Sequence, residues 1–222
     1  MTYPAACPSY ALMMKLLPGS QVDRYVVESV LGAGGMATVY QVRHSVLGSH
    51  HALKVLAQEL VANVEIRDRF LAEGRVLAQL HHPHLLSVTD VVVVPGVAGL
   101  VVELLKGESL EELIDRDGPQ TPQRIGEYLL PVLDAVGHCH DAGIVHRDLK
   151  PANIFIERSG AVARPVVLDF GIAKIRSTSE FAQARKKQTR AAVTLGTSHY
   201  MAPEQIKQSR EVDNRADIFS LG

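Results

Sequence analysis

Eight residues near the middle of the chain place a carboxylate, two cations and an amide close together. Residues 146–153 read His-Arg-Asp-Leu-Lys-Pro-Ala-Asn, which puts Asp148, Lys150 and Asn153 in one short segment. A carboxylate can orient a hydroxyl nucleophile, and a cation can neutralise charge on a moving phosphoryl group. Carboxylate and amide oxygens are also ligands for magnesium. These residue types in this order indicate phosphoryl-transfer chemistry.

A further carboxylate, Asp169, follows sixteen residues after Asn153 in the sequence Asp-Phe-Gly. It comes directly after the apolar run at residues 165–168, which predicts a strand that ends at the carboxylate. A carboxylate between a strand and a glycine is well placed to hold a metal. The alternative is a charged loop followed by an unrelated turn aspartate, and the order and spacing of the two motifs argue against it.

Two features nearer the N-terminus suit phosphate binding but are weak when each is taken alone. Residues 32–37 read Gly-Ala-Gly-Gly-Met-Ala between two strand-like runs, and glycine backbones can approach phosphate oxygens closely. Most glycine-rich hairpins are only tight turns. Lys54 lies in an apolar strand, and Glu73 follows nineteen residues later as a candidate carboxylate partner. The alternative is a lysine that extends from a strand edge into water.

Taken together, these segments resemble the motif set of bacterial serine/threonine protein kinases of the eukaryotic-like (Hanks) type, over residues 25–222. The resemblance implies that Asp148 is the catalytic base and that Lys150 stabilises the charge of the transferred phosphate. It also implies that Lys54 contacts the ATP phosphates and pairs with Glu73. Lys150 within this motif points to serine and threonine hydroxyls as acceptors.

The same resemblance implies ATP as the phosphate donor and Mg²⁺ as the metal, with Mn²⁺ as an alternative. Asn153 and Asp169 would be the metal ligands. The third glycine of the kinase loop is replaced by Ala37, which slightly weakens the loop motif. The positions assigned to ATP binding are Leu31, Gly32, Ala33, Gly34, Gly35, Val39, Ala52, Lys54, Val102, Glu103, Leu105, Glu108 and Phe155.

The segment between Asp169 and the Ala-Pro-Glu sequence at residues 202–204 resembles a kinase activation segment. It is basic and contains several hydroxyl residues, so a phosphate there could pair with its arginines or with Arg147. Thr189 and Thr194 are the candidate phosphorylation sites. The residues to which the resemblance assigns a structural role are Thr197, Glu204 and Asp217.

The elements that must position these residues can be read from periodicity and caps. Apolar runs predict strands at residues 25–31, 38–42, 51–56, 85–94 and 100–105, and a 3–4 spacing predicts a helix at 67–80. Ser109 with Glu112 forms a capping box, and Thr121 before Pro122 predicts a second helix start. Pro131 should kink that helix.

Strands first and helices afterwards predict an α+β fold with a β-rich N-lobe and a mainly helical C-lobe. We expect a loose leader at residues 1–23 and a kinase domain at 24–222. Within that domain the N-lobe would cover about 24–102, the hinge about 103–108 and a partial C-lobe about 109–222. Residues 217–222 resemble the start of the central C-lobe helix, so we expect the chain to be a fragment of a longer kinase.

Three functions compete. An active protein kinase fits every motif, since no catalytic position is substituted. A catalytically silent nucleotide-binding scaffold is the alternative for a chain with an incomplete C-lobe. A small-molecule kinase of related fold would lack the segment around residues 196–204 that suggests protein substrates.

The bulk composition fits a chain that acts in the cytoplasm. Lys plus Arg (23) nearly balances Asp plus Glu (24), which gives no sign of a nucleic-acid partner. Two cysteines suit a reducing compartment, and no apolar run within the chain is long enough to cross a membrane, although an anchor could follow Gly222. Histidines gather at residues 81–84 and 138–140 without matching cysteine or carboxylate partners for zinc. Self-association for autophosphorylation in trans is a further expectation.

Overall fold

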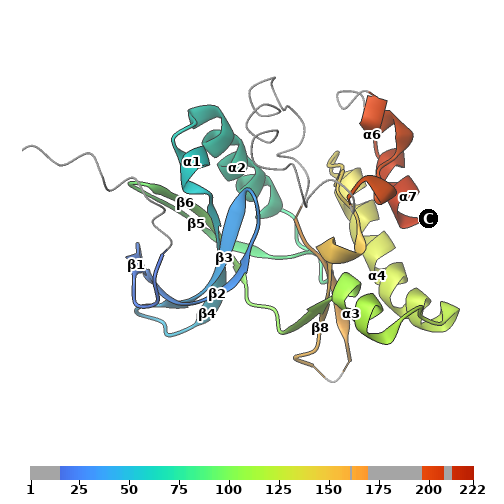
Figure 1. Ribbon diagram of the computed structural model, residues 1–222, viewed down its shortest axis with the longest axis horizontal. Coiled ribbons are helices and arrows are strands. Elements are labelled where there is room, and N and C mark those ends of the chain that lie inside the picture. The colour runs from blue at the N-terminus through green and yellow to red at the C-terminus, as the bar shows by residue number, and fades with distance from the viewer. Residues whose placement is uncertain (1–15, 161, 170–196, 208–211) are drawn as a thin grey trace, which may run out of the picture. The chain divides into compact units, whose positions relative to one another are not determined.

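The structure is a computed structural model that describes residues 16–160, 162–169, 197–207 and 212–222 (Figure 1). The described residues form two compact units. The first comprises the residues up to Gly74 together with Val88–Leu104, and the second comprises Arg75–Ser87 and Leu105–Gly222. The expected α+β class, with strands concentrated early and helices later, is confirmed.

The first unit is built on an antiparallel sheet with the strand order β1-β2-β3-β4-β6-β5. Its strands are β1 (Gln21–Val22), β2 (Tyr25–Ala33), β3 (Ala37–His44), β4 (His50–Leu56), β5 (Val88–Val94) and β6 (Val97–Glu103). The short helix α1 (Gln58–Val61) follows β4, and α2 (Val64–Leu77) lies against the sheet, as Figure 1 shows.

Each face of this sheet has its own apolar core because side chains alternate along a strand. On β4, Leu53 and Val55 belong to one core, which also contains Tyr40, Val42 and Val101. The opposite face carries the second core, in which α2 packs on the sheet. Its buried members are Leu56, Phe70, Leu71, Ala98 and Leu100.

The second unit combines a small sheet with helices. Strands β7 (Gly107–Ser109), β8 (Ile154–Glu157) and β9 (Arg164–Val167) form an antiparallel sheet in that order. The helical elements are α3 (Leu110–Asp117), α4 (Pro122–Asp141), the 3-10 helices η1 (Pro151–Asn153) and η3 (Thr197–Tyr200), α6 (Pro203–Lys207) and α7 (Arg215–Leu221). The core lies among α3, α4 and the strands, with Leu113, Val132 and Ile156 fully buried.

The predicted helix starts are confirmed. Ser109 Oγ accepts the Glu112 N–H at 3.1 Å, and the Glu112 carboxylate accepts the Ser109 N–H at 2.7 Å, so both halves of the capping box are present. Thr121 caps α4 by accepting the Arg124 N–H. Helix α4 continues through Pro131.

Several predicted boundaries are wrong. The predicted strand at 85–94 begins only at Val88, and the strand expected at 100–105 is β6, which ends at Glu103. The helix expected at 67–80 is α2, which runs from Val64 to Leu77. Within the expected leader, Gln21 and Val22 pair with β2. Among the described residues no helix is both long and apolar enough to span a bilayer.

Candidate active site

Lys54 lies in the middle of β4, on the sheet face that α2 covers. It shares this face with Ala52 and Leu56, because residues two apart on a strand point the same way. Its ladder partners are Val39 on β3 and Leu100 on β6. Directly opposite residues share a face, so both neighbours lie beside the lysine. The predicted phosphate-binding lysine therefore lies on a strand that is paired on both sides.

Glu73 lies on α2 and is buried, with only 9% of its surface exposed. The next residue, Gly74, approaches β6 so closely that a Cβ atom there would lie 2.2 Å from Leu100 Cδ2. Leu100 is the ladder partner of Lys54. Helix α2 therefore brings Glu73 to the part of the sheet that carries Lys54, as a Lys54–Glu73 ion pair would require.

The glycine-rich segment forms the turn between β2 and β3. Gly32 pairs with Val39 in the ladder, and the Gly34 N–H donates to the Ala37 carbonyl at 2.9 Å. A Cβ atom at Gly32 or Gly35 would meet nothing within 4 Å, so packing among the described residues does not require glycine there. Close approach of a ligand would explain it. The five consecutive residues around this turn are all exposed: Leu31, Gly32, Ala33, Gly34 and Gly35.

The remaining residues that were assigned to ATP binding divide between the two units. In the first unit, Ala52 pairs with Val102 across β4 and β6, and both are buried. Glu103 ends β6. In the second unit, Leu105 follows the last residue of the first, and Phe155 lies on β8 opposite Ser109.

The candidate catalytic loop is fixed by the carboxylate of Asp217, which is fully buried in α7. Asp217 Oδ2 accepts the His146 N–H and Oδ1 accepts the Arg147 N–H, both at 2.8 Å. His140, at the end of α4, donates its Nε2–H to the same carboxylate at 2.8 Å. Three donors hold this buried charge, as a desolvated carboxylate requires. The structural role predicted for Asp217 is consistent with this arrangement.

His146 connects this anchor to the two carboxylates of the site. Its Nδ1 accepts the Asp148 N–H at 3.2 Å, so the ring proton lies on Nε2, which donates to the Leu168 carbonyl at 2.7 Å. The ring is 1% exposed, and burial lowers the pKa of His146. A neutral imidazole therefore joins the backbone of Asp148 to the residue before Asp169.

Asp148, Asn153 and Lys150 converge on one another. Asn153 Nδ2 donates to the Asp148 carbonyl at 2.8 Å and to its Oδ2 at 3.1 Å. Lys150 Nζ lies 3.3 Å from the same Oδ2. The carboxylate is thus oriented by an amide and lies beside a cation. A hydroxyl brought to it would meet both an acceptor for its proton and a positive charge.

The residues predicted to hold magnesium fit an oxygen-ligated cation. Asn153 uses Nδ2 for Asp148, which leaves its Oδ1 as a metal-type oxygen donor. The Asn153 carbonyl accepts the Leu168 N–H at 2.8 Å, so the backbone draws Asp169 toward η1. Asp169 is exposed and has a left-handed φ of 37°. An amide oxygen of Asn153 and a carboxylate of Asp169 are the hard oxygen ligands that suit Mg²⁺.

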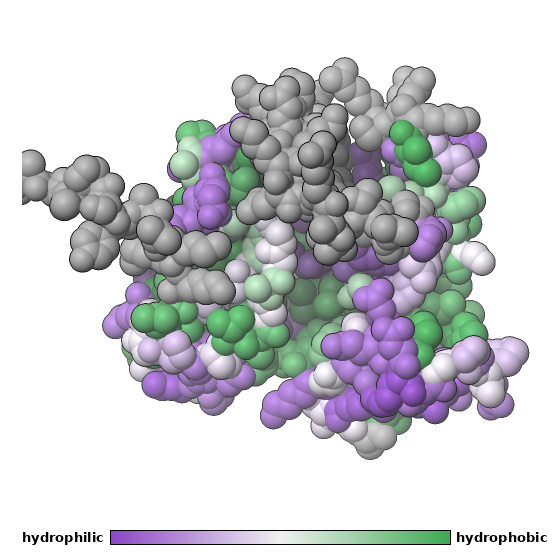
Figure 2. All heavy atoms as spheres, viewed as in Figure 1, coloured by the Kyte–Doolittle hydropathy of each residue, from purple (hydrophilic) through white to green (hydrophobic). Residues whose placement is uncertain are grey.

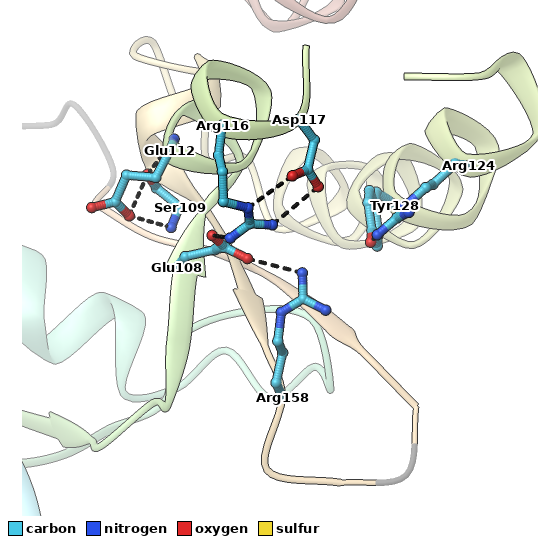
Figure 3. Close-up of polar contacts among 8 residues, drawn as sticks. All are labelled: Glu108, Ser109, Glu112, Arg116, Asp117, Arg124, Tyr128 and Arg158. Atoms are coloured by element: carbon cyan, nitrogen blue, oxygen red, sulfur yellow. Dashed lines mark hydrogen bonds and ion pairs between the residues drawn. The ribbon is translucent and has the colours of Figure 1, made fainter. Parts of the chain in front are cut away.

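Glu108 belongs to an ion-pair cluster (Figure 3). Its carboxylate accepts from Arg116 and, at 2.9 Å, from Arg158, which directly follows β8. Arg116 also binds Asp117 at 2.8 Å. In Figure 2 hydrophilic side chains gather on this part of the surface, over α3 and β8. Glu108, one of the positions assigned to ATP binding, therefore already forms ion pairs with two guanidinium groups of its own unit.

Some predicted residues lie outside the described part of the chain. These are the phosphorylation candidates Thr189 and Thr194, and the side chain of Thr197, whose backbone belongs to η3. Glu204 is exposed in the first turn of α6. The metal, catalytic and ATP roles stay predictions, although their positions are now known.

Sequence reasoning missed two residues that support the loop. His140 was considered only as a member of a histidine cluster, and it donates to Asp217. Gln205 had no motif at all, yet its Nε2 donates to the Arg147 carbonyl at 2.9 Å. Both contacts join residues far apart in sequence, and no periodicity or local spacing signals such a pair.

Comparison with known proteins gives a consistent result. The model of the protein kinase domain family matches residues 25–222. The serine/threonine-protein kinase PknB of Mycobacterium tuberculosis is 36% identical over 209 residues, which cover 92% of this chain and 32% of PknB. PknB of Corynebacterium glutamicum, a probable serine/threonine-protein kinase, is 36% identical over 204 residues, covering 90% and 30%. The chain thus spans about a third of the length of these relatives.

Solved structures agree. The kinase domain of Mycobacterium tuberculosis PknI (C20A_R136A double mutant) superposes with a TM-score of 0.71 at 30% identity, covering 94% of this chain and 73% of that one. Rad53 1-466 in complex with AMP-PNP superposes with a TM-score of 0.68 at 26% identity, covering 89% and 46%. With the family match over most of its length, the chain belongs to the protein kinase domain family, and its relatives include bacterial serine/threonine kinases of the Hanks type.

Proposed function

We propose that the protein transfers the γ-phosphate of ATP to serine and threonine hydroxyls of protein substrates, itself included. The observation that carries the proposal is the convergence on Asp148 of Asn153 Nδ2 at 3.1 Å and Lys150 Nζ at 3.3 Å. This is the arrangement needed to align a hydroxyl and to neutralise charge at the same point. The AMP-PNP bound to Rad53 supports a nucleotide as the donor.

In this proposal Asp148 accepts the hydroxyl proton as the oxygen attacks the γ-phosphorus. The bond between that phosphorus and the β–γ bridging oxygen breaks, and ADP leaves. Asn153 holds the Asp148 carboxylate in one orientation. Lys150 stays beside it and balances the charge on the transferred group. Magnesium, when held by Asn153 Oδ1 and Asp169, would supply charge neutralisation at the phosphate oxygens.

Lys54 would bind the α- and β-phosphates, and the open glycine hairpin would cover them with backbone N–H groups. Glu73 would hold the lysine in place. This role is supported by the burial of Glu73 and by the packing of α2 against the strand that pairs with Lys54. A buried carboxylate is stabilised by a cationic partner.

We further propose control by phosphorylation of Thr189 or Thr194. Among the described residues, Arg147 Nε and Nη1 are buried and have no hydrogen-bond partner. A buried guanidinium with unsatisfied nitrogens is stabilised by an anion that accepts hydrogen bonds from them. A phosphate on the segment at 170–196 would provide one. We expect this chemistry in the cytoplasm and, for autophosphorylation, between two copies.

The experiment is phosphopeptide mass spectrometry of the purified chain after incubation with Mg-ATP, beside Asp148→Asn. We expect phosphate on Thr189 or Thr194 in the parent only. Equal phosphate in both proteins would point to a contaminating kinase. Absence from both, in this chain and in the natural full-length protein, would favour a nucleotide-binding scaffold and contradict the proposal.

Mixing the active chain with a tagged Asp148→Asn chain tests the route of autophosphorylation. Phosphate on the tagged, inactive chain would establish transfer between copies. Phosphate confined to the active chain would mean that each molecule modifies itself. Replacing Mg²⁺ by Mn²⁺ in the same assay tests the choice of metal.

A further inference from the structure

The side chain of Gln205 links two backbone segments of the second unit that lie 58 residues apart in sequence. Its Nε2 donates to the Arg147 carbonyl at 2.9 Å, and its Oε1 accepts the Ala202 N–H at 3.0 Å. One partner is an acceptor and the other is a donor. An amide in this orientation satisfies both, whereas a carboxylate or an apolar side chain of the same length does not.

The backbone that Gln205 holds is in an unfavourable conformation. Arg147 has a φ of 65°, in the left-handed region that costs a residue with a Cβ atom free energy. Such residues persist where several contacts fix them. Here the Arg147 N–H is held by Asp217 Oδ1 and its carbonyl by Gln205 Nε2, so side chains from α7 and α6 hold both polar groups of one peptide residue.

The residue directly after this fixed point is Asp148. Its carboxylate direction depends on the backbone at Arg147, because rotation there swings the following residue. Asn153 and Lys150 contact Asp148 only from its own loop. Gln205 ties this loop to the Ala-Pro-Glu segment at residues 202–204.

We propose that Gln205 is a positioning residue for phosphoryl transfer, which rests on the kinase function proposed above. Through Nε2 it keeps the Arg147 carbonyl in place and so aims Asp148. Through Oε1 it fixes Ala202, which makes the alignment of the catalytic loop depend on the placement of the 202–204 segment. A change in that segment would therefore reach Asp148 through one side chain.

A purely local role for Gln205 is the competing explanation. The Ala202 N–H lies just before α6, and Oε1 could serve only to cap the start of this helix. That role needs the acceptor atom and not the donor. Gln205→Glu keeps an acceptor for Ala202 and removes the donor to Arg147, so it separates the two roles. Gln205→Met removes both.

The chain offers a matched control in Gln120. Its Nε2 donates to the Gly118 carbonyl at 2.8 Å in the turn between α3 and α4. Gln120→Glu therefore makes the same chemical change, with the loss of a donor to a backbone carbonyl. It does so at a contact that joins two residues of the same turn.

Two readouts on the full chain test the proposal: hydrogen exchange at the Asp148 and Ala202 amides, and kcat with KM for ATP. We expect Gln205→Glu to speed exchange at Asp148 about tenfold and to lower kcat about tenfold, with KM changed less than about twofold. Exchange at Ala202 should stay near the parent rate in Gln205→Glu and rise in Gln205→Met. Gln120→Glu should match the parent in both readouts.

Unchanged exchange at Asp148 in Gln205→Glu would overturn the proposal, and so would a fall in kcat no larger than that of Gln120→Glu. If the parent and Asp148→Asn are equally inactive, the kinase function fails instead. In that case the Asp148 and Ala202 exchange rates still decide whether Gln205 couples the two segments.

Discussion

Replacing Gly74 by alanine tests whether the close packing of α2 on β6 sets the position of Glu73. A Cβ atom at this position would lie 2.2 Å from Leu100 Cδ2, 3.0 Å from Cδ1 and 3.1 Å from Cγ. Carbon atoms in contact sit about 3.5–4.0 Å apart, so the nearest pair would have to separate by more than about 1 Å. Leu100 is buried in the core between α2 and the sheet, which limits its own movement.

Two effects on stability oppose each other in this variant. Overpacking a buried contact costs about 1–3 kcal/mol, whereas Gly to Ala inside a helix gains about 1 kcal/mol. We expect a net loss of about 0–2 kcal/mol, which leaves the protein folded. The effect on catalysis should be larger, because a displacement of about 1 Å in a positioning group can cost about 100-fold in rate.

The assay pairs urea unfolding with kcat/KM for Mg-ATP. Gly74→Ala should lower kcat/KM by about 10- to 100-fold, and adding Leu100→Ala should recover part of that loss because it removes the colliding atoms. Gly126→Ala is the control. It lies inside α4, where a Cβ atom would meet nothing within 4 Å, so stability should rise by about 1 kcal/mol without loss of activity.

One result would refute this reasoning. If Gly74→Ala behaves like Gly126→Ala, with raised stability and kcat/KM within about twofold of the parent, the contact with Leu100 does not set the position of Glu73.

Three further outcomes are expected. Asp217→Asn should lower the free energy of urea unfolding by about 3 kcal/mol, because it places an N–H₂ group against N–H donors that now share a buried carboxylate. Asp213→Asn, at an exposed ion pair, should cost less than about 0.5 kcal/mol. Equal losses would contradict the role of Asp217 in fixing the His146 and Arg147 backbone. Burial lowers the pKa of His146 below that of the unfolded chain, so its stabilisation is present above about pH 6.5 and is lost as pH falls below it, with a slope of at most about 1.4 kcal/mol per pH unit. The unfolding free energy of His146→Gln, measured from pH 8 to 5, should therefore fall less steeply than that of the parent, and parallel curves would exclude this source. Glu108→Gln should lower the free energy of unfolding by about 1 kcal/mol at low salt and by clearly less at 1 M salt, since the arginines that it contacts are partly exposed. A loss of stability that does not depend on salt would mean that packing, not charge, holds the cluster.

The parts of the fold that depend on neighbouring residues were predictable. The capping box at Ser109 and the cap at Thr121 need contacts only three residues long, and both are present. Asp148, Lys150 and Asn153 also lie within one loop, so the motif alone predicted that these three side chains lie close together.

Other parts required information that no local pattern contains. The apolar run at 85–94 predicts one strand, but its first three residues belong to the second unit. There the Leu86 N–H donates to the Val167 carbonyl at 3.0 Å. Apolar residues suit both environments, so the boundary at Val88 is invisible in the sequence. Gln205 and His140 were missed because each acts on a partner at least 58 residues away.

The strand order has a consequence for synthesis on the ribosome. Strand β6 pairs with β4, yet β4 ends at Leu56 and β6 begins only at Val97. At about 5–20 residues per second, roughly 2–8 s pass between the two strands. During that interval β4 is an unpaired edge that carries Lys54 among apolar neighbours, the kind of edge that invites association with other chains.

The first unit is also discontinuous in sequence, so no single stretch of nascent chain contains all of it. Residues 75–87 leave it for the second unit before Val88–Leu104 return to complete its sheet. Translation that pauses before Val88 would therefore hold an incomplete sheet. A protease that nicks the folded protein between 75 and 87 would cut the chain without detaching either piece, because strands from both sides of the nick remain paired through β4 and β6.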